Sequence, residues 1–256
     1  MKLIALDSSG LVASAAILAD GQLLAEYSVN YKKMHSRTLL PMLDAIAKMT
    51  ELDLSSVDAI AVAAGPGSFT GLRIGSATAK GIGLALEKPI VEVPTLAALA
   101  YNLYDAKGII CPIMDARRQQ VYNALYRFEN HQLKEISEER AISVEELCAE
   151  LNAAGTESQE AGSSAADEPV IFLGDGVSVY RETIDELMKR PYSYAPAHLA
   201  RQRAGAVGAL GEVLFAEGKF VKAEEHVPVY LRKSQAERER EAGEAEKSQK
   251  ESGKKV

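Results

Sequence analysis

The chain has 256 residues, which is enough for one large domain or two smaller ones with a substantial hydrophobic core. Hydrophobic residues make up 47% and charged residues 25%, as in ordinary globular proteins. The formal net charge of −7 argues against a nucleic-acid binder that acts alone, because such a protein needs a basic face. We therefore expect any contact with RNA to depend on another subunit.

The cysteines and the N-terminus indicate the compartment. Cys111 and Cys148 are far apart and form no C-x-x-C motif, which fits a reducing environment without disulfides or a zinc site. The apolar run that begins at Met1 meets Asp7 and is too short for a signal peptide. We therefore expect a cytoplasmic protein that does not contact a membrane.

The first part of the chain predicts a strand hairpin and then alternating strands and helices, which is typical of an α/β protein. In the helix expected near residues 38–49, Leu39, Leu43 and Ile46 line one face, and Pro41 is compatible with a helix only in its first turn. Strands are expected at 3–6, 12–18, 22–29, 59–64 and 89–93, and helices from 36 or 38 to 49, from about 70 to 86, and over 95–104.

A second cycle of elements begins at residue 109. Residues 3–9 and 111–117 both have an apolar strand, an Asp and a small polar turn, each followed by a return strand, at an offset of 108 residues. This match favours a duplication. We therefore expect two related subdomains, at residues 1–108 and 109–232.

The remainder of the second half predicts both ordered and disordered segments. Ser143 and Glu146 form a capping box at the start of a helix that reaches Leu151. Residues 155–168 are of low complexity and predict a mobile insertion, and the charged tail 233–256 predicts disorder because it has almost no apolar residues. Further elements are expected as a strand at 169–173 and helices near 178–189 and 197–217.

Residues 63–75 read A-A-G-P-G-S-F-T-G-L-R-I-G and constrain the function more than any other stretch. Gly65 and Gly67 follow a buried strand and permit positive φ, and the next helix offers free N–H groups to an anion. A phosphate site and a tight strand-to-helix turn around Pro66 are equally compatible with this pattern. No Gly-Lys-Ser/Thr sequence follows, so the turn is not a P-loop.

The helix after this turn has a ridge of small residues, because Gly71, Gly75, Ala79 and Gly83 recur in steps of four. Glycine within a helix costs roughly 1 kcal/mol relative to alanine, so the ridge requires a compensating contact with a closely packed second backbone. The chain's own sheet could supply that contact, but a sheet covers one side only and the helix is apolar nearly all round. The partner interface that we expect comprises Leu39, Leu43, Ile46, Gly71, Leu72, Gly75, Ala79, Ile82 and Gly83.

Five segments together resemble the TsaB (YeaZ) family. They are H-S-R-T-L-L-P at 35–41, A-G-P-G-S-F-T-G-L-R-I-G at 64–75, D-A-R-R-Q-Q-V-Y at 115–122, G-D-G at 174–176 and P-V-Y-L-R at 228–232. Each motif alone is weak, but five in order are specific. The resemblance implies an actin/Hsp70/sugar-kinase-like (ASKHA) α/β fold made of two related subdomains of mixed sheet with helices.

The same resemblance implies a non-catalytic subunit in the synthesis of N6-threonylcarbamoyladenosine beside the anticodon of tRNA. Its partners would be a TsaD-like catalytic subunit, which carries the transfer chemistry, and a TsaE-like ATPase. The chain would pair through its helices with the TsaD-like subunit or with itself as a homodimer. It would require no cofactor of its own, with ATP or ADP bound at the complex, and it would meet tRNA only through that complex.

The Asp-led turns argue against catalysis by this chain. Catalytic relatives of the fold hold phosphate and metal with two such turns, usually with glycine beside the second Asp. Residues 7–10 keep that form, whereas two arginines stand close after Asp115. Either Asp could instead bond its own turn backbone. The expected vestigial nucleotide site comprises Asp7, Ser8, Gly65, Gly67 and Asp115.

Two enzyme classes remain as alternatives to a partner-binding subunit. An ATP-dependent kinase or ligase of the same fold is motivated by Asp7, Ser8 and the glycine turn. A glycoprotease-like peptidase is suggested only by relatives of the fold. The metal-binding histidine pair of TsaD has no counterpart, because no H-x-x-x-H or H-E-x-x-H pattern occurs among His35, His131, His198 and His226.

Overall fold

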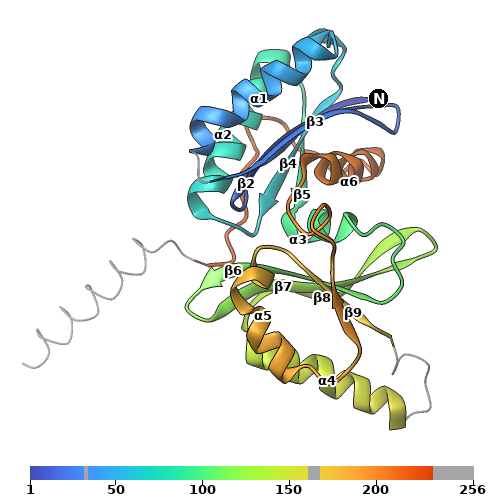
Figure 1. Cartoon of the computed structure of the whole chain (residues 1–256). Coiled ribbons are helices and arrows are strands. Elements are labelled where there is room, and N and C mark those ends of the chain that lie inside the picture. Colours follow the sequence, from blue (N-terminus) through green and yellow to red (C-terminus); the bar gives the residue numbers. More distant parts are fainter. Residues whose placement is uncertain (32–33, 161–167, 233–256) are drawn as a thin grey trace, which may run out of the picture.

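Two mixed sheets of five strands each form the framework of the protein, one above the other in Figure 1. The computed structural model describes residues 1–31, 34–160 and 168–232, without the side chains of 155–160. Two predicted features lie outside the described residues: the disordered tail after residue 232, and the part of the mobile insertion at 161–167.

The first sheet has the order β3-β2-β1-β4-β5 and consists of β1 (Lys2–Asp7), β2 (Val12–Ala19), β3 (Gln22–Asn30), β4 (Ala59–Gly65) and β5 (Ile90–Pro94). β1 runs antiparallel to β2 and parallel to β4. Helices cover both faces of this sheet, with α1 (His35–Met49) and α2 (Phe69–Leu86) on one and α6 (Ala204–Ala216) on the other. Every residue of β4 is therefore buried.

The second sheet repeats this arrangement. Its order is β8-β7-β6-β9-β10, with β6 (Ile109–Arg117), β7 (Gln120–Glu129), β8 (Gln132–Ser143), β9 (Val170–Leu173) and β10 (Tyr192–Tyr194). β6 is antiparallel to β7 and parallel to β9, just as β1 is to β2 and β4. The sequence patterns missed β8, a charged edge strand, and β10, which has three residues.

The helices differ from their predicted limits, and three of the differences are instructive. α1 begins at His35, so Pro41 is its seventh residue and lies outside the first turn, on the exposed side of the helix. α4 (Val144–Glu160) continues past Leu151 through residues 155–160, which were predicted to belong to the mobile insertion. The segment 197–203, predicted as the start of a helix, precedes α6 as an irregular connection. The other helices are α3 (Thr95–Tyr101), α5 (Gly176–Leu187) and the short 3-10 helix Leu54–Ser56.

The predicted capping box at the start of α4 is confirmed. The Ser143 hydroxyl accepts a hydrogen bond from the backbone N–H of Glu146 at 3.1 Å, and the Glu146 carboxylate accepts one from the N–H of Ser143 at 3.3 Å. Of the helices in the described ranges, none combines the length and the apolar composition that a bilayer span requires.

The chain returns to the first subdomain after residue 203, which corrects the assignment of all residues 109–232 to the second. Val207 and Leu210 of α6 share one core with Leu3 and Val93 of the first sheet. The second face of this sheet needs an apolar cover, and α6 supplies it. The described residues from 204 to about 230 therefore belong with the first subdomain.

α3 joins the two sheets on one side of the molecule. Its residues 95–100 are all buried, and Leu96 and Leu99 share a core with Met114 and Leu173 of the second sheet. The two subdomains therefore meet through packed side chains at this side, below α6 in Figure 1.

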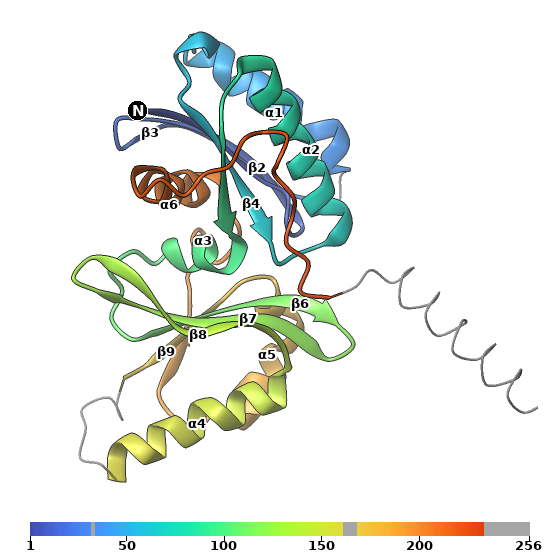
Figure 2. The ribbon, with the colours of Figure 1, turned by 180° about the vertical axis from the view of Figure 1, so that it is seen from behind.

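Residues 221–232, which we call the C-terminal strap, form a further connection between the subdomains. Ile90 and Val221 exchange two backbone hydrogen bonds of 2.9 Å at the edge of β5. The strap then runs beside α2 and ends next to β6, as Figure 2 shows from behind.

Candidate functional site

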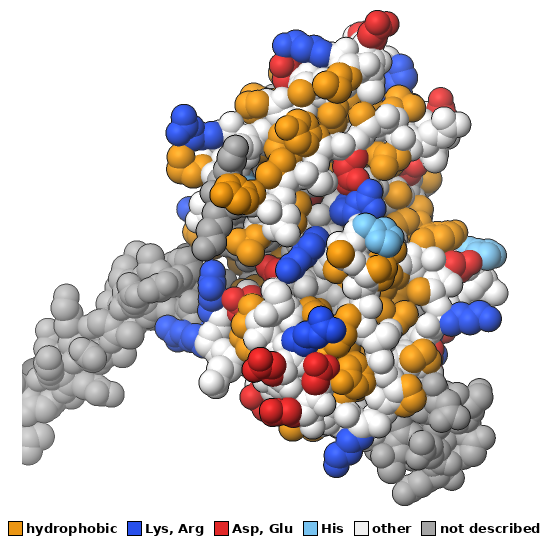
Figure 3. All heavy atoms as spheres, in the orientation of Figure 1, with side chains coloured by type: hydrophobic (Ala, Val, Ile, Leu, Met, Phe, Trp, Pro, Cys, Tyr) orange, Lys and Arg blue, Asp and Glu red, His pale blue; other side chains and the backbone are white. Residues whose placement is uncertain are grey.

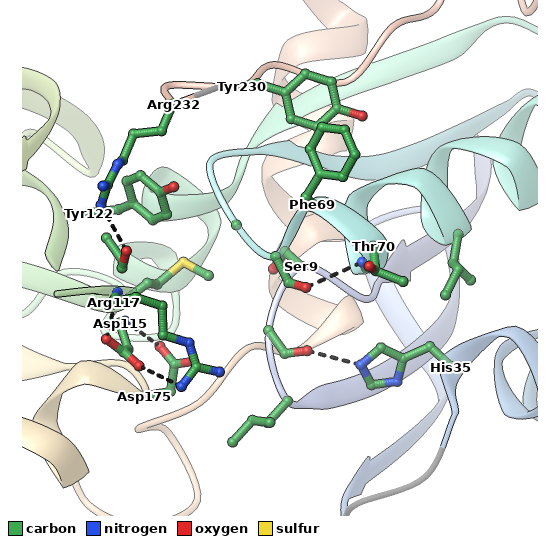
Figure 4. Close-up of a pocket in the computed structure, with 18 of the residues that line it drawn as sticks. Ser9, His35, Phe69, Thr70, Asp115, Arg117, Tyr122, Asp175, Tyr230 and Arg232 are labelled. Carbon is green, nitrogen blue, oxygen red and sulfur yellow. Dashed lines mark hydrogen bonds and ion pairs between the residues drawn. The ribbon is translucent and has the colours of Figure 1, made fainter. Parts of the chain in front are cut away.

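A pocket of about 670 Å³ lies between the two subdomains. That volume is within the range of small-molecule sites. In Figure 4, Asp115, Arg117 and Asp175 lie on the side of the second subdomain, and Ser9 and His35 lie opposite them. The first turns of α1, α2 and α5 also line the pocket, through His35, Ser36, Phe69, Thr70, Ser178 and Val179.

All five sequence segments that carry the family resemblance reach this pocket. Because the segments belong to both subdomains, only the folded chain brings them together. Their lining residues are His35 and Ser36, then Gly67 to Gly71 and Ile74, then Asp115, Ala116, Arg117 and Tyr122, then Asp175, and finally Tyr230, Leu231 and Arg232.

The glycine turn packs against the chain itself. Gly65 has φ of 135°, and a Cβ built there would lie 2.2 Å from the carbonyl oxygen of Val229 in the strap. A Cβ on Gly67 would lie 2.5 Å from the carbonyl oxygen of Ser9, which accepts the N–H of Ser68 at 2.7 Å. Of the two interpretations of this turn, the structure favours tight packing over a phosphate site at Gly65.

The small-residue ridge of α2 also faces the chain's own backbone, which corrects the expectation that a partner covers it. A Cβ on Gly71 would lie 2.0 Å from the carbonyl oxygen of Ser8, and one on Gly75 would lie 2.6 Å from the Ser8 hydroxyl. At Gly83 the nearest neighbours are Lys88 and Ala223, both at 3.0 Å. The β1–β2 turn and the strap therefore supply the close contact that the glycines require.

The other predicted interface residues are mostly interior as well. Leu39, Leu43 and Ile46 of α1 are buried in the core between α1, α2 and the first sheet. Leu72 and Ala79 are also buried, and Ile82 is half-buried. These side chains stabilise the first subdomain, and apart from Ile82 they leave almost no exposed surface for a second protein.

A different face of α2 is exposed. Ala77, Gly81 and Ala85 recur in steps of four on this face, and a Cβ on Gly81 would meet nothing within 4 Å. Leu84 beside them is 55% exposed, as is Leu40 of α1. Figure 3 shows hydrophobic side chains on the surface of the upper subdomain, where α1 and α2 lie. The sequence pattern placed an interface on these helices but chose the inward-facing residues.

Asp7 and Ser8 do not line the pocket. Asp7 is 1% exposed, and its Oδ1 accepts hydrogen bonds from the N–H and the hydroxyl of Ser9 at 2.9 and 2.7 Å. Burial raises the pKa of Asp7 to about 6. The Ser8 hydroxyl donates to the carbonyl oxygen of Gly71 at 2.8 Å. Asp7 is therefore a turn residue that bonds its own backbone, as in the simpler of the two interpretations.

Asp115 does line the pocket, and its hydrogen bonds go to residues of its own subdomain. Its Oδ1 accepts the N–H of Arg117 at 2.8 Å and the hydroxyl of Tyr180 at 3.3 Å. Its own N–H donates to Oδ1 of Asp175 at 3.3 Å, and burial raises the pKa of Asp175. Of the five residues predicted as a vestigial nucleotide site, Gly67 and Asp115 therefore reach the pocket, whereas Asp7, Ser8 and Gly65 do not.

Sequence reasoning missed the aromatic side of the pocket. Tyr230 packs on Phe69 with ring centroids 4.7 Å apart, and the guanidinium of Arg73 lies 4.0 Å from the Phe69 centroid. Nε of Arg73 donates to the Tyr230 hydroxyl at 3.3 Å. Arg232 Nη1 donates to the carbonyl oxygen of Ala116 at 2.8 Å. The P-V-Y-L-R segment was the available signal, but nothing in it indicated which residues it would contact.

His35 and the acidic residues do not assemble a metal site. His35 Nε2 lies 2.9 Å from the carbonyl oxygen of Gly10, which fits the position of His35 as the first residue of α1. Across the described ranges, no group of three or more His, Cys, Asp or Glu residues is arranged to hold a metal ion.

Comparisons with known proteins agree on one family. The family model for TsaD, tRNA N6-adenosine threonylcarbamoyltransferase, matches residues 22–240. A Bacillus subtilis protein named tRNA threonylcarbamoyladenosine biosynthesis protein TsaB is 30% identical over 237 residues, covering 93% of this chain and 96% of the relative. The Escherichia coli protein of the same name is 29% identical over 246 residues, covering 92% and 96%.

A solved structure supports the same assignment. YeaZ from Pseudomonas aeruginosa has a TM-score of 0.74 and 29% identity, and the match covers 90% of this chain and 99% of that one. The two sheets of equal strand order give the chain the ASKHA fold that the resemblance implied. On the family model, the relatives and the fold together, the chain belongs to the TsaB (YeaZ) family.

Proposed function

We propose that this chain is a non-catalytic subunit in the biosynthesis of threonylcarbamoyladenosine in tRNA, and that it acts by binding a TsaD-like catalytic subunit. The names of its full-length relatives support the pathway, and the family model that matches most of the chain is that of a threonylcarbamoyltransferase. A cytoplasmic location, a TsaE-like ATPase as a further partner, and tRNA contact through the assembled complex belong to the same proposal.

The exposed face of α2 is the observation that carries the partner-binding role. Gly81 lies within a helix and has open space beside it, so no contact among the described residues explains a glycine there. A glycine or alanine at each of the positions 77, 81 and 85 lets a second helix approach closely. Leu84 of α2 and Leu40 of α1 add exposed apolar side chains to the same pair of helices. A helical face of the TsaD-like subunit, or of a second copy in a homodimer, would bury them.

Co-purification of the full chain with a TsaD-like protein tests this role. The Gly81→Leu variant should lose the partner, because the side chain fills the space that a second helix would use. The same change should not harm the free chain, because leucine favours helix more than glycine does. Ala153→Leu, at an exposed position of α4, is the matched control and should keep the partner. Retention of the TsaD-like protein by Gly81→Leu would contradict the proposed face.

Gly75, although it lies on the ridge of small residues, is a less informative position for such a substitution. A side chain at Gly75 would collide with the Ser8 hydroxyl, so loss of binding could follow from a damaged fold. Gly81 separates the two effects because a Cβ there would meet no atom of the described residues within 4 Å.

An ATP-dependent enzyme of the same fold is the second candidate. The size of the pocket between the subdomains and the three helix N-termini that line it favour this alternative, since such termini attract anions. Asp7 opposes it, because its carboxylate is buried in a turn and does not line the pocket. Calorimetry of the isolated chain with MgATP distinguishes the two. Tight, magnesium-dependent binding with phosphoryl transfer would favour the enzyme, and its absence would leave the partner-binding role.

A further inference from the structure

The C-terminal strap is anchored to the first subdomain by several contacts. Nζ of Lys80 donates to the carbonyl oxygens of Glu224 and His226, both at 3.0 Å. Nδ1 of the buried His226 lies 2.6 Å from a carboxylate oxygen of Glu92. The strap is therefore fixed along α2 and β5 before it reaches the pocket.

The next residues of the strap pass over the glycine turn. The N–H of Val229 donates to the carbonyl oxygen of Ala64 at 2.7 Å, and the Val229 carbonyl packs directly on Gly65. The Tyr230 ring then packs at a tilt on Phe69 in the first turn of α2, and the Tyr230 hydroxyl accepts a hydrogen bond from Arg73. Any side chain at position 65 would displace this part of the strap, so the turn and the strap are matched in shape.

Arg232 carries the strap across to the second subdomain. Its guanidinium donates to the carbonyl oxygen of Ala116 at the end of β6, at 2.8 Å. Figure 4 shows Arg232 reaching from the strap toward the wall that holds Asp115 and Arg117. Tyr230, Leu231 and Arg232 all line the pocket. The strap thus bridges the pocket, whereas the buried core around α3 joins the subdomains elsewhere.

We propose that the C-terminal strap is a latch that holds the two subdomains at one angle and keeps the pocket between them narrow. Arg232 makes the contact that closes the latch, because its charge-assisted hydrogen bond to the carbonyl oxygen of Ala116 links the strap to β6. Tyr230 positions Arg232 through its ring contact with Phe69. When the hydrogen bond from Arg232 to Ala116 breaks, the subdomains turn about the packed α3 region and the pocket opens. The proposal does not depend on which partner the chain binds.

Distance measurements across the pocket mouth test the latch in the full chain. Leu11 and Val179 are exposed residues that line the pocket from opposite subdomains, and each can be replaced by a spin-labelled cysteine. The native Cys111 and Cys148 are buried and should not take the label. The latched chain should give one narrow distance distribution. Arg232→Ala and Tyr230→Ala should shift it to longer distances and broaden it.

Two further variants keep the result interpretable. Arg118→Ala removes an exposed arginine from the neighbouring hairpin and should leave the distribution unchanged. Arg232→Lys keeps a cationic donor and should restore most of the narrow distribution. Amide exchange of Val229, in the chain without spin labels, gives a second readout. It should be about tenfold faster in Arg232→Ala than in wild type, as expected for loss of one charge-assisted hydrogen bond. Unchanged distances and exchange in a folded Arg232→Ala variant would overturn the latch.

Discussion

The small residues of α2 have opposite roles according to the direction in which they point. Gly71 and Gly75 face the β1–β2 turn, where a Cβ would overlap Ser8. Gly81 faces open space, where a Cβ would touch nothing. Inward glycines allow the chain to pack on itself, whereas an outward glycine weakens the free helix without any internal benefit.

Alanine substitutions at Gly71 and Gly81 should therefore change stability in opposite directions. Gly81→Ala should raise the free energy of unfolding by about 0.5–1 kcal/mol, because it removes backbone freedom from the unfolded chain. Gly71→Ala should lower it by about 1–3 kcal/mol, because the new methyl group overlaps the carbonyl oxygen of Ser8 at 2.0 Å. Urea unfolding monitored by circular dichroism measures both. Equal effects of the two substitutions would contradict this assignment of the two faces.

Asp7 should make stability depend on pH. Burial raises its pKa from 3.8 to about 6, so the folded state binds the proton more tightly than the unfolded state does. The resulting stabilisation is complete below pH 3.8 and is lost as pH rises through 6. The loss amounts to about 3 kcal/mol, from the size of the pKa change. Asp7→Asn does not titrate and should lack this slope.

Urea unfolding at several pH values between 4 and 7 tests the assignment to Asp7. Burial also raises the pKa of Glu139, to about 7, but Glu139 titrates in both proteins. The difference between wild type and Asp7→Asn therefore separates the Asp7 carboxyl from Glu139. A difference that stays constant over this range would show that Asp7 is not the titrating group.

At the scale of elements, α1 and α2 form one layer on the first sheet. The inner side of this layer is part of the core, and its outer side is exposed. Leu39, Leu43 and Ile46 face the first sheet, and Leu40 faces outward. Under the proposed function, the outer sides of both helices contact the TsaD-like subunit together. A change on α1 should therefore weaken binding as well as a change on α2.

Leu40→Glu should reduce recovery of the TsaD-like protein at least tenfold, because it buries a charge in an apolar contact. Stability of the free chain should change by less than about 0.5 kcal/mol, since Leu40 is a surface residue. Leu24→Glu, on the edge strand β3, is a matched control because Leu24 and Leu40 are similarly exposed, at 47% and 55%. Comparable loss of the partner with both variants would place the contact elsewhere.

Most elements could be predicted from the sequence because their signals are local. The capping box at Ser143 and the buried apolar strand β4 were both predicted, and both are present in the structure. The direction of the α2 ridge could not be predicted, because a helix that is apolar nearly all round gives no indication of which side meets the sheet. β8 was missed because an exposed edge strand is rich in charged residues and lacks the alternating pattern.

The pocket was only partly predictable for a related reason. Asp115 and Gly67 were chosen from turn patterns, but the contacts of Tyr230 and Arg232 with residues more than 100 positions earlier depend on the path of the whole chain. Likewise α6 was placed with the second subdomain because the chain order suggested it, whereas the open face of the first sheet determined where it packs.

At the scale of the whole molecule, the net charge bears on the proposed contact with tRNA through the complex. The net charge of −7 repels a polyanion. The exposed Arg117 and Arg118 at the β6–β7 turn form only a small basic patch. We therefore expect the isolated chain to bind tRNA no more tightly than the non-specific range of about 10⁻⁴ to 10⁻⁶ M at physiological salt. The complex with a TsaD-like subunit should bind more tightly.

Gel-shift titrations with one tRNA and three samples test this expectation: the chain alone, the TsaD-like protein alone, and the two together. If the chain contributes Arg117 and Arg118 to the complex, replacing both by alanine should weaken binding by the pair and reduce its salt dependence, because fewer phosphate contacts release fewer counterions. If these arginines play no part, the double variant should leave the pair unchanged. Tight, salt-sensitive binding by the isolated chain would contradict the idea that tRNA is met only through the complex, because an acidic protein could achieve it only with a basic face that its composition does not suggest.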